Sequence, residues 1–406
     1  MSSSAASKDL DASPFPKSKL FQPTPFGSLT LQHRIVLAPL TRMRSTNDTF
    51  TPLPIVPSYY AQRASVPGTF LISEGTAVTA NGLAWSNTPG IWSDEQIKQW
   101  KNVTNAVHER KSIIFSQLFA AGRTVDIAFL KSVDPSFVVS GPSDIPLSSS
   151  GFAEGQGQGH VHPLTIAEIK EYVRAFGQAA KNAVEGAGFD GVEVNLANGY
   201  LLDQFLQDTS NQRTDEYGGS VENRTRLPLE VVEEVVRALG GAEEKVGIRF
   251  SPWSVFQDMR MKDPKPTFAY LIRKLKESFP NLAYLHVIEP RIAGSSDADV
   301  DVVEELETES NDFLREIWAP KPFISAGGYN RESAIKRVEE YDGVGLIAFG
   351  RLFISNPDLP FRLSRKIPLA KYDRETFYSP SDNSGTGYTD YSFSELFKGQ
   401  NIKMDR

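Results

Sequence analysis

The chain has 406 residues, and its 50 acidic and 43 basic side chains give a net charge of -7 at pH 7. This balance argues against nucleic acid or an anionic membrane as the main partner. Apolar residues make up 40% of the chain, enough for a large core, and the absence of cysteine excludes disulfides, thiolate metal sites and cysteine nucleophiles.

Residues 1–19 are rich in Ser and Ala and are predicted to be disordered. They lack the apolar core of a secretory signal, and no later stretch approaches the roughly 18 apolar residues of a membrane span. We therefore expect a cytoplasmic protein that acts on a small molecule, as a monomer or homodimer, without a membrane or nucleic-acid partner.

From residue 26 onward, a hairpin arm around Gly27-Ser28 is followed by apolar strands that alternate with amphipathic helices. The predicted strands are 35–40, 69–74, 112–118, a central strand through Val192 and Val194, 245–250, 282–288, 322–326 and 345–349. The predicted helices are 57–65, 94–110, 165–185, 221–239, 264–279, 309–318, 331–340 and 357–365. Residues 119–163, rich in Ser, Pro and Gly, break this rhythm, as functional loops often do.

Eight strands, nearly all followed by a helix, predict an α/β fold of the (β/α)₈ TIM barrel type. We expect an N-terminal hairpin and a long excursion after the third strand. The alternative is a doubly wound open sheet, which is weakened because no G-x-G-x-x-G follows the first strand. The predicted organisation is a disordered segment 1–19, a barrel 20–378 and a C-terminal tail 379–406.

Polar side chains gather where the central strand ends. Asn195 and Asn198 supply two side-chain amides, and Tyr200 supplies a phenol. Two amide donors and a weak acid could hold a carbonyl oxygen and protonate its neighbour. On this stretch alone, the alternative is a strand-to-helix turn in which Asn198-Gly199 only satisfies backbone geometry. Because the active site of a barrel lies at the carboxyl ends of its strands, the other strand ends favour the first interpretation.

Two glycine loops end the seventh and eighth strands, at Gly327-Gly328 and Gly350-Arg351. Barrels bind phosphate there with backbone N–H groups, so a phosphate site is predicted. Arg249 ends the fifth strand, and its burial would be costly unless it faced an anion or an electron-rich ring. By contrast, His160 and His162 lack further ligands at zinc spacing, so we interpret them as a solvated loop and predict no metal.

Several motifs together resemble one family. The most specific is 211–224, which is interpreted physically as a polar network with a helix cap at Ser220. The other matching segments are 38–41, 325–329, 350–359 and 372–378. From about Leu20 to Tyr378 the chain resembles the old yellow enzymes, FMN-containing and NADPH-dependent ene-reductases with a (β/α)₈ barrel, in particular their fungal and plant branch.

The resemblance implies a role for each strand end. Pro39 and Thr41 would contact the flavin ring of FMN, and Thr41 would tune its reduction potential. Gly75 and Gln117 would bind the polar edge of the ring. The remaining implied residues are Arg249 against N1 and O2, Gly328, Gly350 and Arg351 at the phosphate, and Phe377 and Tyr378 on the substrate side.

The implied reaction has two halves in one site. NADPH reduces FMN, and an α,β-unsaturated carbonyl then accepts hydride at its β-carbon while Tyr200 protonates its α-carbon. The family usually has His where this chain has Asn195. An amide still donates a hydrogen bond but cannot become cationic, so we expect a working ene-reductase with an altered substrate preference.

Two alternatives stay open. One is a specialised reductase or isomerase of an enal in secondary metabolism. The other is a flavin-binding protein whose turnover is impaired by Asn195, against which the retained Tyr200 argues.

Overall fold

The computed structural model describes residues 17–148, 159–293, 296–297, 309–341 and 343–404. Eight parallel strands pair in the order β4-β3-β15-β14-β11-β10-β9-β6, and β4 pairs with β6 to close the ring. They are β3 (Ile35–Leu37), β4 (Phe70–Ile72), β6 (Ile113–Phe119), β9 (Gly191–Leu196), β10 (Val246–Phe250), β11 (Tyr284–Ile288), β14 (Phe323–Ala326) and β15 (Gly345–Phe349). The predicted (β/α)₈ barrel is confirmed, and closure excludes the open sheet.

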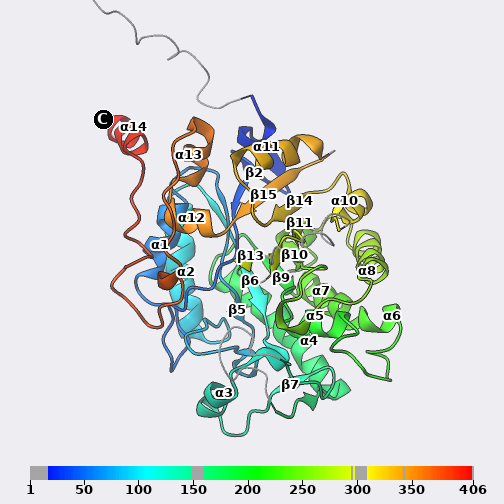
Figure 1. The fold of residues 1–406 in the computed structure, drawn as a ribbon. Coiled ribbons are helices and arrows are strands. Elements are labelled where there is room, and N and C mark those ends of the chain that lie inside the picture. Colours follow the sequence, from blue (N-terminus) through cyan, green and yellow to red (C-terminus); the bar gives the residue numbers. More distant parts are fainter. Residues whose placement is uncertain (1–16, 149–158, 294–295, 298–308, 342, 405–406) are drawn as a thin grey trace, which may run out of the picture.

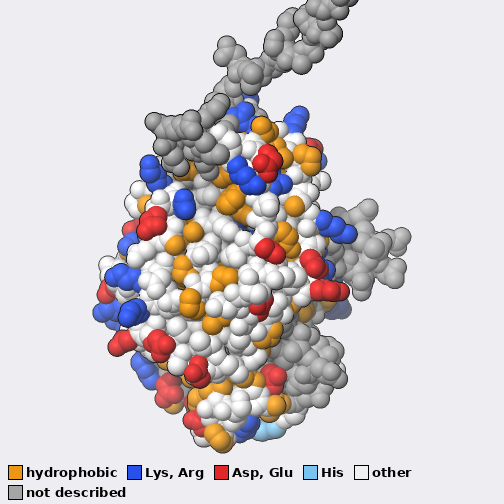
Figure 2. Space-filling model, turned by 90° about the vertical axis from the view of Figure 1, so that its left-hand side faces the viewer, with side chains coloured by type: hydrophobic (Ala, Val, Ile, Leu, Met, Phe, Trp, Pro, Cys, Tyr) orange, Lys and Arg blue, Asp and Glu red, His pale blue; other side chains and the backbone are white. Residues whose placement is uncertain are grey.

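Helices surround the strands (Figure 1). Three of them begin at capping boxes, in which a polar side chain satisfies an N–H that the helix leaves unpaired. These are α2 (Asp94–His108), α4 (Ile166–Lys181) and α11 (Arg331–Glu340). The other helices after barrel strands include α1 (Val56–Arg63), α7 (Arg226–Ala238), α8 (Lys265–Ser278), α10 (Asp312–Trp318) and α13 (Leu359–Arg365). Basic and acidic side chains are interspersed over the face shown in Figure 2.

Strand residues alternate between two cores because successive side chains point to opposite faces of a strand. Val192 and Val194 of β9 pack outward in the large cluster that also holds helix residues such as Phe176. The barrel interior holds a separate cluster, to which Phe70 and Phe115 belong. The predicted hairpin, β1 (Thr24–Phe26) and β2 (Leu29–Leu31), adds the Phe26 ring, whose centroid lies 4.9 Å from that of Phe70.

The excursion after β6 is more ordered than its composition indicated. It contains α3 (Ile127–Val133) and the short paired strands β7 (Ser140–Gly141) and β8 (His162–Pro163), while residues 149–158 lie outside the described part. The predicted helix 221–239 is divided into α6 (Val221–Arg224) and α7. α5 (Leu201–Leu206) follows β9, where the helical spacing of apolar residues after Tyr200 indicated a helix. α12 (Arg351–Ser355), which we did not predict, follows β15.

Both ends of the chain are only partly described. Residues 1–16 of the segment predicted to be disordered lie outside the described residues. Beyond residue 378 the chain packs against the barrel, because the buried Tyr388 ring stacks on Tyr59 with centroids 4.2 Å apart. The last described element is α14 (Glu395–Met404). Among the described helices, none has both the length and the apolar character needed to cross a membrane.

Candidate active site

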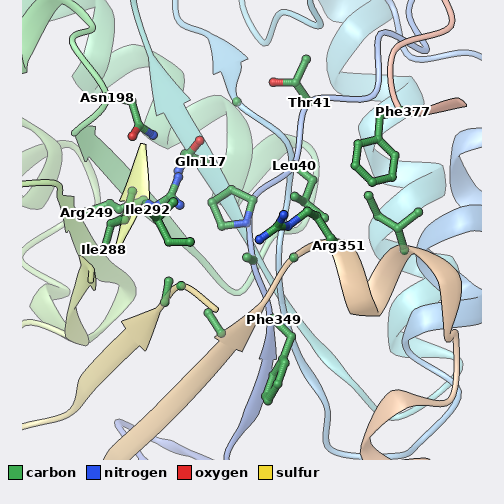
Figure 3. A pocket seen from close by; sticks show the side chains of 18 of the residues that line it. Leu40, Thr41, Gln117, Asn198, Arg249, Ile288, Ile292, Phe349, Arg351 and Phe377 are labelled. Atoms are coloured by element: carbon green, nitrogen blue, oxygen red, sulfur yellow. The ribbon is translucent and has the colours of Figure 1, made fainter. Parts of the chain in front are cut away.

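A cavity of about 610 Å³ opens at the carboxyl ends of the barrel strands (Figure 3). Small-molecule sites typically have volumes of roughly 300–1,000 Å³. The cavity brings together every residue that we predicted for the site: Pro39, Thr41, Gly75, Gln117, Asn195, Asn198, Tyr200, Arg249, Gly327, Gly328, Gly350, Arg351, Phe377 and Tyr378. The strand-end interpretation therefore identified one continuous surface.

Other lining residues were missed. Ala38, Ala326 and Ala348 are small residues near the strand ends, and their size leaves room above the aromatic interior of the barrel. Their position two residues beyond inward-facing side chains could have identified them. Trp85 and Phe256 come from loops and carry no sequence signal that separates them from ordinary core aromatics.

The two amides are held differently. The Asn195 Oδ1 atom accepts a hydrogen bond from the Ala197 backbone N–H at 3.1 Å, which leaves its amino group as the donor available to a ligand. Asn198 has a left-handed backbone with φ 59°, and its N–H donates to Ser251 Oγ at 2.7 Å. The buried Asn198 Oδ1 atom has no hydrogen-bond partner among the described residues. Both side chains therefore retain unused hydrogen-bonding groups at the cavity.

Tyr200 lies directly before α5, with its ring against Phe119 at a centroid distance of 5.1 Å. Burial raises the pKa of the Tyr200 phenol well above its ordinary value, and the nearby Tyr378 raises it further. The hydroxyl group therefore keeps its proton over the neutral range and acts as a donor there. Gln257, which we did not predict, forms a side-chain hydrogen bond that lowers the pKa of Tyr200.

A buried carboxyl group holds the turn that carries these side chains. Asp203 Oδ2 accepts from the Gly199 backbone N–H at 2.8 Å, and its Oδ1 accepts from Gln207 Nε2 at 2.8 Å. Gly199 has φ 73°, and a Cβ atom there would lie 2.8 Å from the Gln257 Cβ atom. This turn requires glycine on both counts. Burial raises the pKa of the Asp203 carboxyl to about 7.

Gln117 and Arg249 lie next to each other at one side of the opening (Figure 3). Among the described residues the Arg249 side chain makes no hydrogen bond, and its Nε atom is buried. Gln117 Nε2 donates to Glu193 Oε1 at 2.7 Å. A half-buried guanidinium group that no protein acceptor hydrogen-bonds is costly, so this side of the cavity is suited to a ligand with acceptor atoms.

The glycine loops form another side of the cavity. Gly327 and Gly328 have φ values of 124° and 59°, which favour glycine, and a Cβ atom on Gly328 would lie 2.9 Å from Arg291 Nε. Gly350 precedes α12, and the Arg351 guanidinium lies 5.6 Å from the centroid of the Tyr372 ring. Close backbone approach and a neighbouring arginine suit a phosphate group.

The C-terminal segment closes the cavity with Phe377 and Tyr378. A fully buried arginine that we did not predict, Arg42, holds this segment. Its Nε atom donates to the Phe377 carbonyl at 3.0 Å and its Nη2 atom to the Gly387 carbonyl at 2.8 Å. Arg42 follows Thr41 directly, so one loop after β3 contributes a lining residue and anchors the neighbouring wall.

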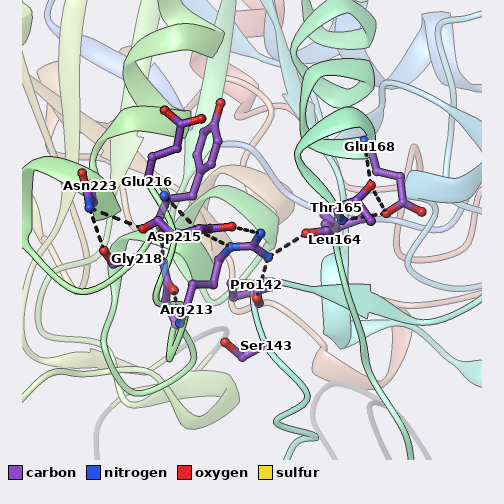
Figure 4. Close-up of polar contacts among 12 residues, drawn as sticks. Pro142, Ser143, Leu164, Thr165, Glu168, Arg213, Asp215, Glu216, Gly218 and Asn223 are labelled. Carbon is purple, nitrogen blue, oxygen red and sulfur yellow. Dashed lines mark hydrogen bonds and ion pairs between the residues drawn. The ribbon is translucent and has the colours of Figure 1, made fainter.

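The 211–224 motif lies outside the cavity and forms a structural network (Figure 4). Arg213 pairs with Asp215 at 2.5 Å and donates to the backbone carbonyls of Pro142 and Leu164. Ser220 caps α6 by accepting from the Asn223 backbone N–H. The interpretation of this motif as a polar network with a helix cap is confirmed.

The two loop histidines each pair with one carboxylate. His160 Nδ1 lies 2.8 Å from Asp144, and His162 Nε2 lies 3.0 Å from Glu168. Within the described ranges, no group of three or more potential metal-binding side chains occurs.

Residues 19–370 match the sequence model of the NADH:flavin oxidoreductase / NADH oxidase family. The chain is 48% identical to chanoclavine-I aldehyde reductase fgaOx3 of Penicillium roqueforti (strain FM164), over 94% of this chain and 98% of that protein. It is 45% identical to the probable inactive reductase easA of Epichloe festucae var. lolii, over 95% and 98%. The crystal structure of Old Yellow Enzyme from Pichia sp. AKU4542 superposes with a TM-score of 0.83 at 36% identity, covering 93% of this chain and 94% of that chain.

Proposed function

The chain belongs to the NADH:flavin oxidoreductase / NADH oxidase family, the old yellow enzymes, and we propose that it uses NADPH to reduce the activated C=C bond of α,β-unsaturated carbonyls. It is an FMN-dependent oxidoreductase. One observation carries the proposal: a single cavity holds an arginine whose side chain makes no hydrogen bond among the described residues, two glycine loops, two amides and a tyrosine whose pKa is raised by burial. That set offers a place for a flavin and a place for a carbonyl compound above it.

The cavity residues fit FMN. Arg249 and the Oε1 atom of Gln117 offer a donor and an acceptor to the pyrimidine edge of the ring. Pro39 and Thr41 would contact the ring, and Gly75 allows close approach beside Gln117. The glycine loops, namely Gly327, Gly328 and Gly350, would hold the phosphate together with Arg351.

When bound, FMN supplies hydride transfer from NADPH to the β-carbon of the substrate. The side chains of this chain supply the rest. The amino groups of Asn195 and Asn198 donate to the carbonyl oxygen and stabilise the negative charge that develops there. The Tyr200 hydroxyl then donates its proton to the α-carbon. Phe377 and Tyr378 line the substrate side and exclude water.

The Asn195 amide makes this binding pair neutral at every assay pH. The described residues contribute no histidine to the cavity lining. Carbonyl binding should therefore vary little between about pH 6 and 8, the range in which a histidine would change charge. The hydrogen bond that this neutral amide donates is weaker than one from a protonated histidine. We therefore expect a preference for strongly activated alkenes.

The test starts from recombinant protein with bound FMN. Anaerobic addition of NADPH should bleach the yellow absorbance, and addition of an enone, a maleimide or a nitroalkene should restore it. NADH in place of NADPH establishes the reductant. A colourless protein that does not bind added FMN, or a reduced protein that none of these alkenes reoxidises, would contradict the proposal.

The names of the relatives favour a second, more specific hypothesis for the function of this chain. Chanoclavine-I aldehyde reductase, at 48% identity, is named for an aldehyde substrate. A specialised enal reductase or isomerase of secondary metabolism is therefore the second candidate for this chain. The 45% identical easA protein is named probable inactive, which keeps impaired turnover as a further alternative. Assays of bulky cyclic enals against simple enones distinguish these readings.

A further inference from the structure

A carboxylate buried inside the barrel lies beneath the predicted flavin edge. Glu193 is on β9 two residues before Asn195, so both side chains point into the barrel. The Glu193 side chain is completely buried. Strand register places Glu193 beside Gln117 of β6 and Asn195 beside Arg249 of β10. A fully buried carboxylate is costly unless its partners compensate for the lost hydration, so its retention requires an explanation.

Its partners show that Glu193 carries a negative charge. Oε1 accepts from Gln117 Nε2 at 2.7 Å, and Oε2 accepts from His286 Nδ1 at 2.8 Å. Burial raises the pKa of the Glu193 carboxyl. Its interactions with His286, Arg249 and Gln117 lower this pKa by more than burial raises it, so the pKa lies below its usual value. Burial lowers the pKa of His286, so its ring is neutral and carries its proton on Nδ1.

The first consequence concerns the orientation of Gln117. A carboxylate can only accept hydrogen bonds, so the Gln117 amino group must face Glu193. The Gln117 Oε1 atom then faces the cavity, 3.4 Å from the point that a Cβ atom on Gly75 would occupy. The Gln117 amide thus presents an acceptor to the ligand, next to the donor groups of Arg249.

The second consequence concerns charge. Burial lowers the pKa of Arg249, whereas Glu193 raises it, so the two side chains stabilise each other's charged forms. Arg249 lines the cavity and Glu193 does not. A ligand above Arg249 therefore experiences a guanidinium charge that is partly opposed from below.

We propose that Glu193 is a positioning residue with two effects. It orients the Gln117 amide so that the cavity floor binds a cyclic imide, and it lowers the reduction potential of the flavin above it. The fixed Gln117 oxygen accepts from the imide N–H, and Arg249 donates to the adjacent carbonyl oxygen. The negative charge of Glu193 opposes the charge that reduction adds at this end of the ring. This inference rests on the proposed placement of FMN against Gln117 and Arg249.

The test is Glu193→Gln in the FMN-loaded enzyme, because this change keeps the size of the side chain and removes its charge. Two readouts do not depend on turnover: the midpoint potential of bound FMN, and the pH at which the flavin imide ionises, followed by absorbance. We expect a higher midpoint potential and an imide pKa lower by about one unit, the usual effect of removing a nearby like charge.

Glu289→Gln is the matched control. Glu289 is also a buried carboxylate, but it pairs with Arg315 at 2.8 Å and Tyr329 at 2.7 Å beneath the glycine loops. This variant should leave both readouts at their wild-type values. If E193Q binds FMN and neither readout changes, or if E289Q shifts both equally, the inference is overturned.

Should E193Q not fold with FMN, Glu193→Asp takes its place. Withdrawing the carboxylate by one methylene group releases Gln117 and should shift both readouts in the same direction by less, and unchanged values would overturn the inference. A wild-type protein that binds no FMN would instead contradict the proposed function. Wild-type turnover combined with unchanged readouts in the variant contradicts only the role of Glu193.

Discussion

Tyr200 is the residue on which the proposed proton transfer depends. Its ring packs against Phe119, and burial raises the pKa of its phenol, so the hydroxyl keeps its proton at neutral pH. A donor with a raised pKa suits protonation of a carbon that becomes strongly basic as hydride arrives.

Replacing Tyr200 with Phe keeps the ring packing and removes the proton. We expect the reoxidation of reduced enzyme by an enone to slow by about 10²–10⁴-fold, the usual contribution of a general acid. Reduction by NADPH should be unchanged. Anaerobic stopped-flow absorbance separates the two half-reactions.

Tyr172→Phe is the control for this change. Tyr172 lies on α4 outside the cavity, where its hydroxyl donates to the Asn81 carbonyl at 3.3 Å. Both half-reactions should keep their wild-type rates in this variant. Equal enone turnover in Y200F and wild type would remove Tyr200 as the proton donor.

Asp203 links the site to stability. Burial raises the pKa of its carboxyl from 3.8 to about 7, so the folded chain binds a proton that the unfolded chain releases. The stability from this group is fully present below the unfolded value and is lost as the pH rises through about 7. The unfolding free energy of the wild type should therefore fall between pH 5 and 8. In Asp203→Asn this fall should be smaller by about 2–3 kcal/mol.

Denaturant titrations of both proteins at the two pH values measure this difference. Burial lowers the pKa of His33 to about 3, which makes stability rise with pH up to the unfolded value of 6.5. That opposing effect is the same in wild type and variant, so it cancels in the comparison. If the unfolding free energies of the two proteins changed with pH in parallel, the pKa of Asp203 would not be raised in the folded protein, which would contradict the prediction.

At the scale of elements, the site depends on segments that are distant in sequence. Tyr372, Phe377 and Tyr378 form one wall of the cavity. The buried Arg42, in the loop after β3, binds this segment at the Phe377 carbonyl and the chain that follows it at the Gly387 carbonyl. The Arg42 guanidinium also lies 5.0 Å from the centroid of the Tyr388 ring. This anchoring explains how a wall without barrel strands keeps a defined position.

Arg42→Met removes the hydrogen bonds and leaves two carbonyl groups unpaired. We expect unfolding free energy to fall by about 2–5 kcal/mol and KM for the alkene to rise, whereas the affinity for FMN should change little. Arg365→Met is the control, because Arg365 is exposed on α13 and lies outside the cavity. A normal KM in a destabilised R42M variant would show that this wall does not shape the substrate site.

The strands and most helices could be predicted because apolar runs and capping residues report local structure directly. The division of helix 221–239 at Thr225 was missed, although Pro228 marks it: proline has no backbone N–H to donate to the Arg224 carbonyl and is favoured in the first turn of a new helix. The conformation of the loop after β10 could not be predicted either, since Gln257 and Asp258 have left-handed backbones without being glycine. Tertiary contacts, such as the Gln257 hydrogen bond to the Asn198 carbonyl at 2.9 Å, hold that loop.

At the scale of the molecule, the closed ring explains why residues from eight strands meet. The alternation of elements predicted a parallel sheet, but only the pairing of β4 with β6 distinguishes a barrel from an open sheet. Once the ring closes, every strand end contributes to one rim. For this reason the residues that line the site could be predicted from the strand ends. The residues that hold them in place, such as Arg42 and Glu193, could not, because their roles depend on partners far away in sequence.

The central claim is that one cavity delivers hydride to the β-carbon of an activated alkene. The most direct measurement uses an enal with NADPH that carries deuterium at its transferable position, and locates the label in the product by NMR. The account predicts a saturated aldehyde with deuterium on its β-carbon. An allylic alcohol with deuterium on its carbonyl-derived carbon would contradict it.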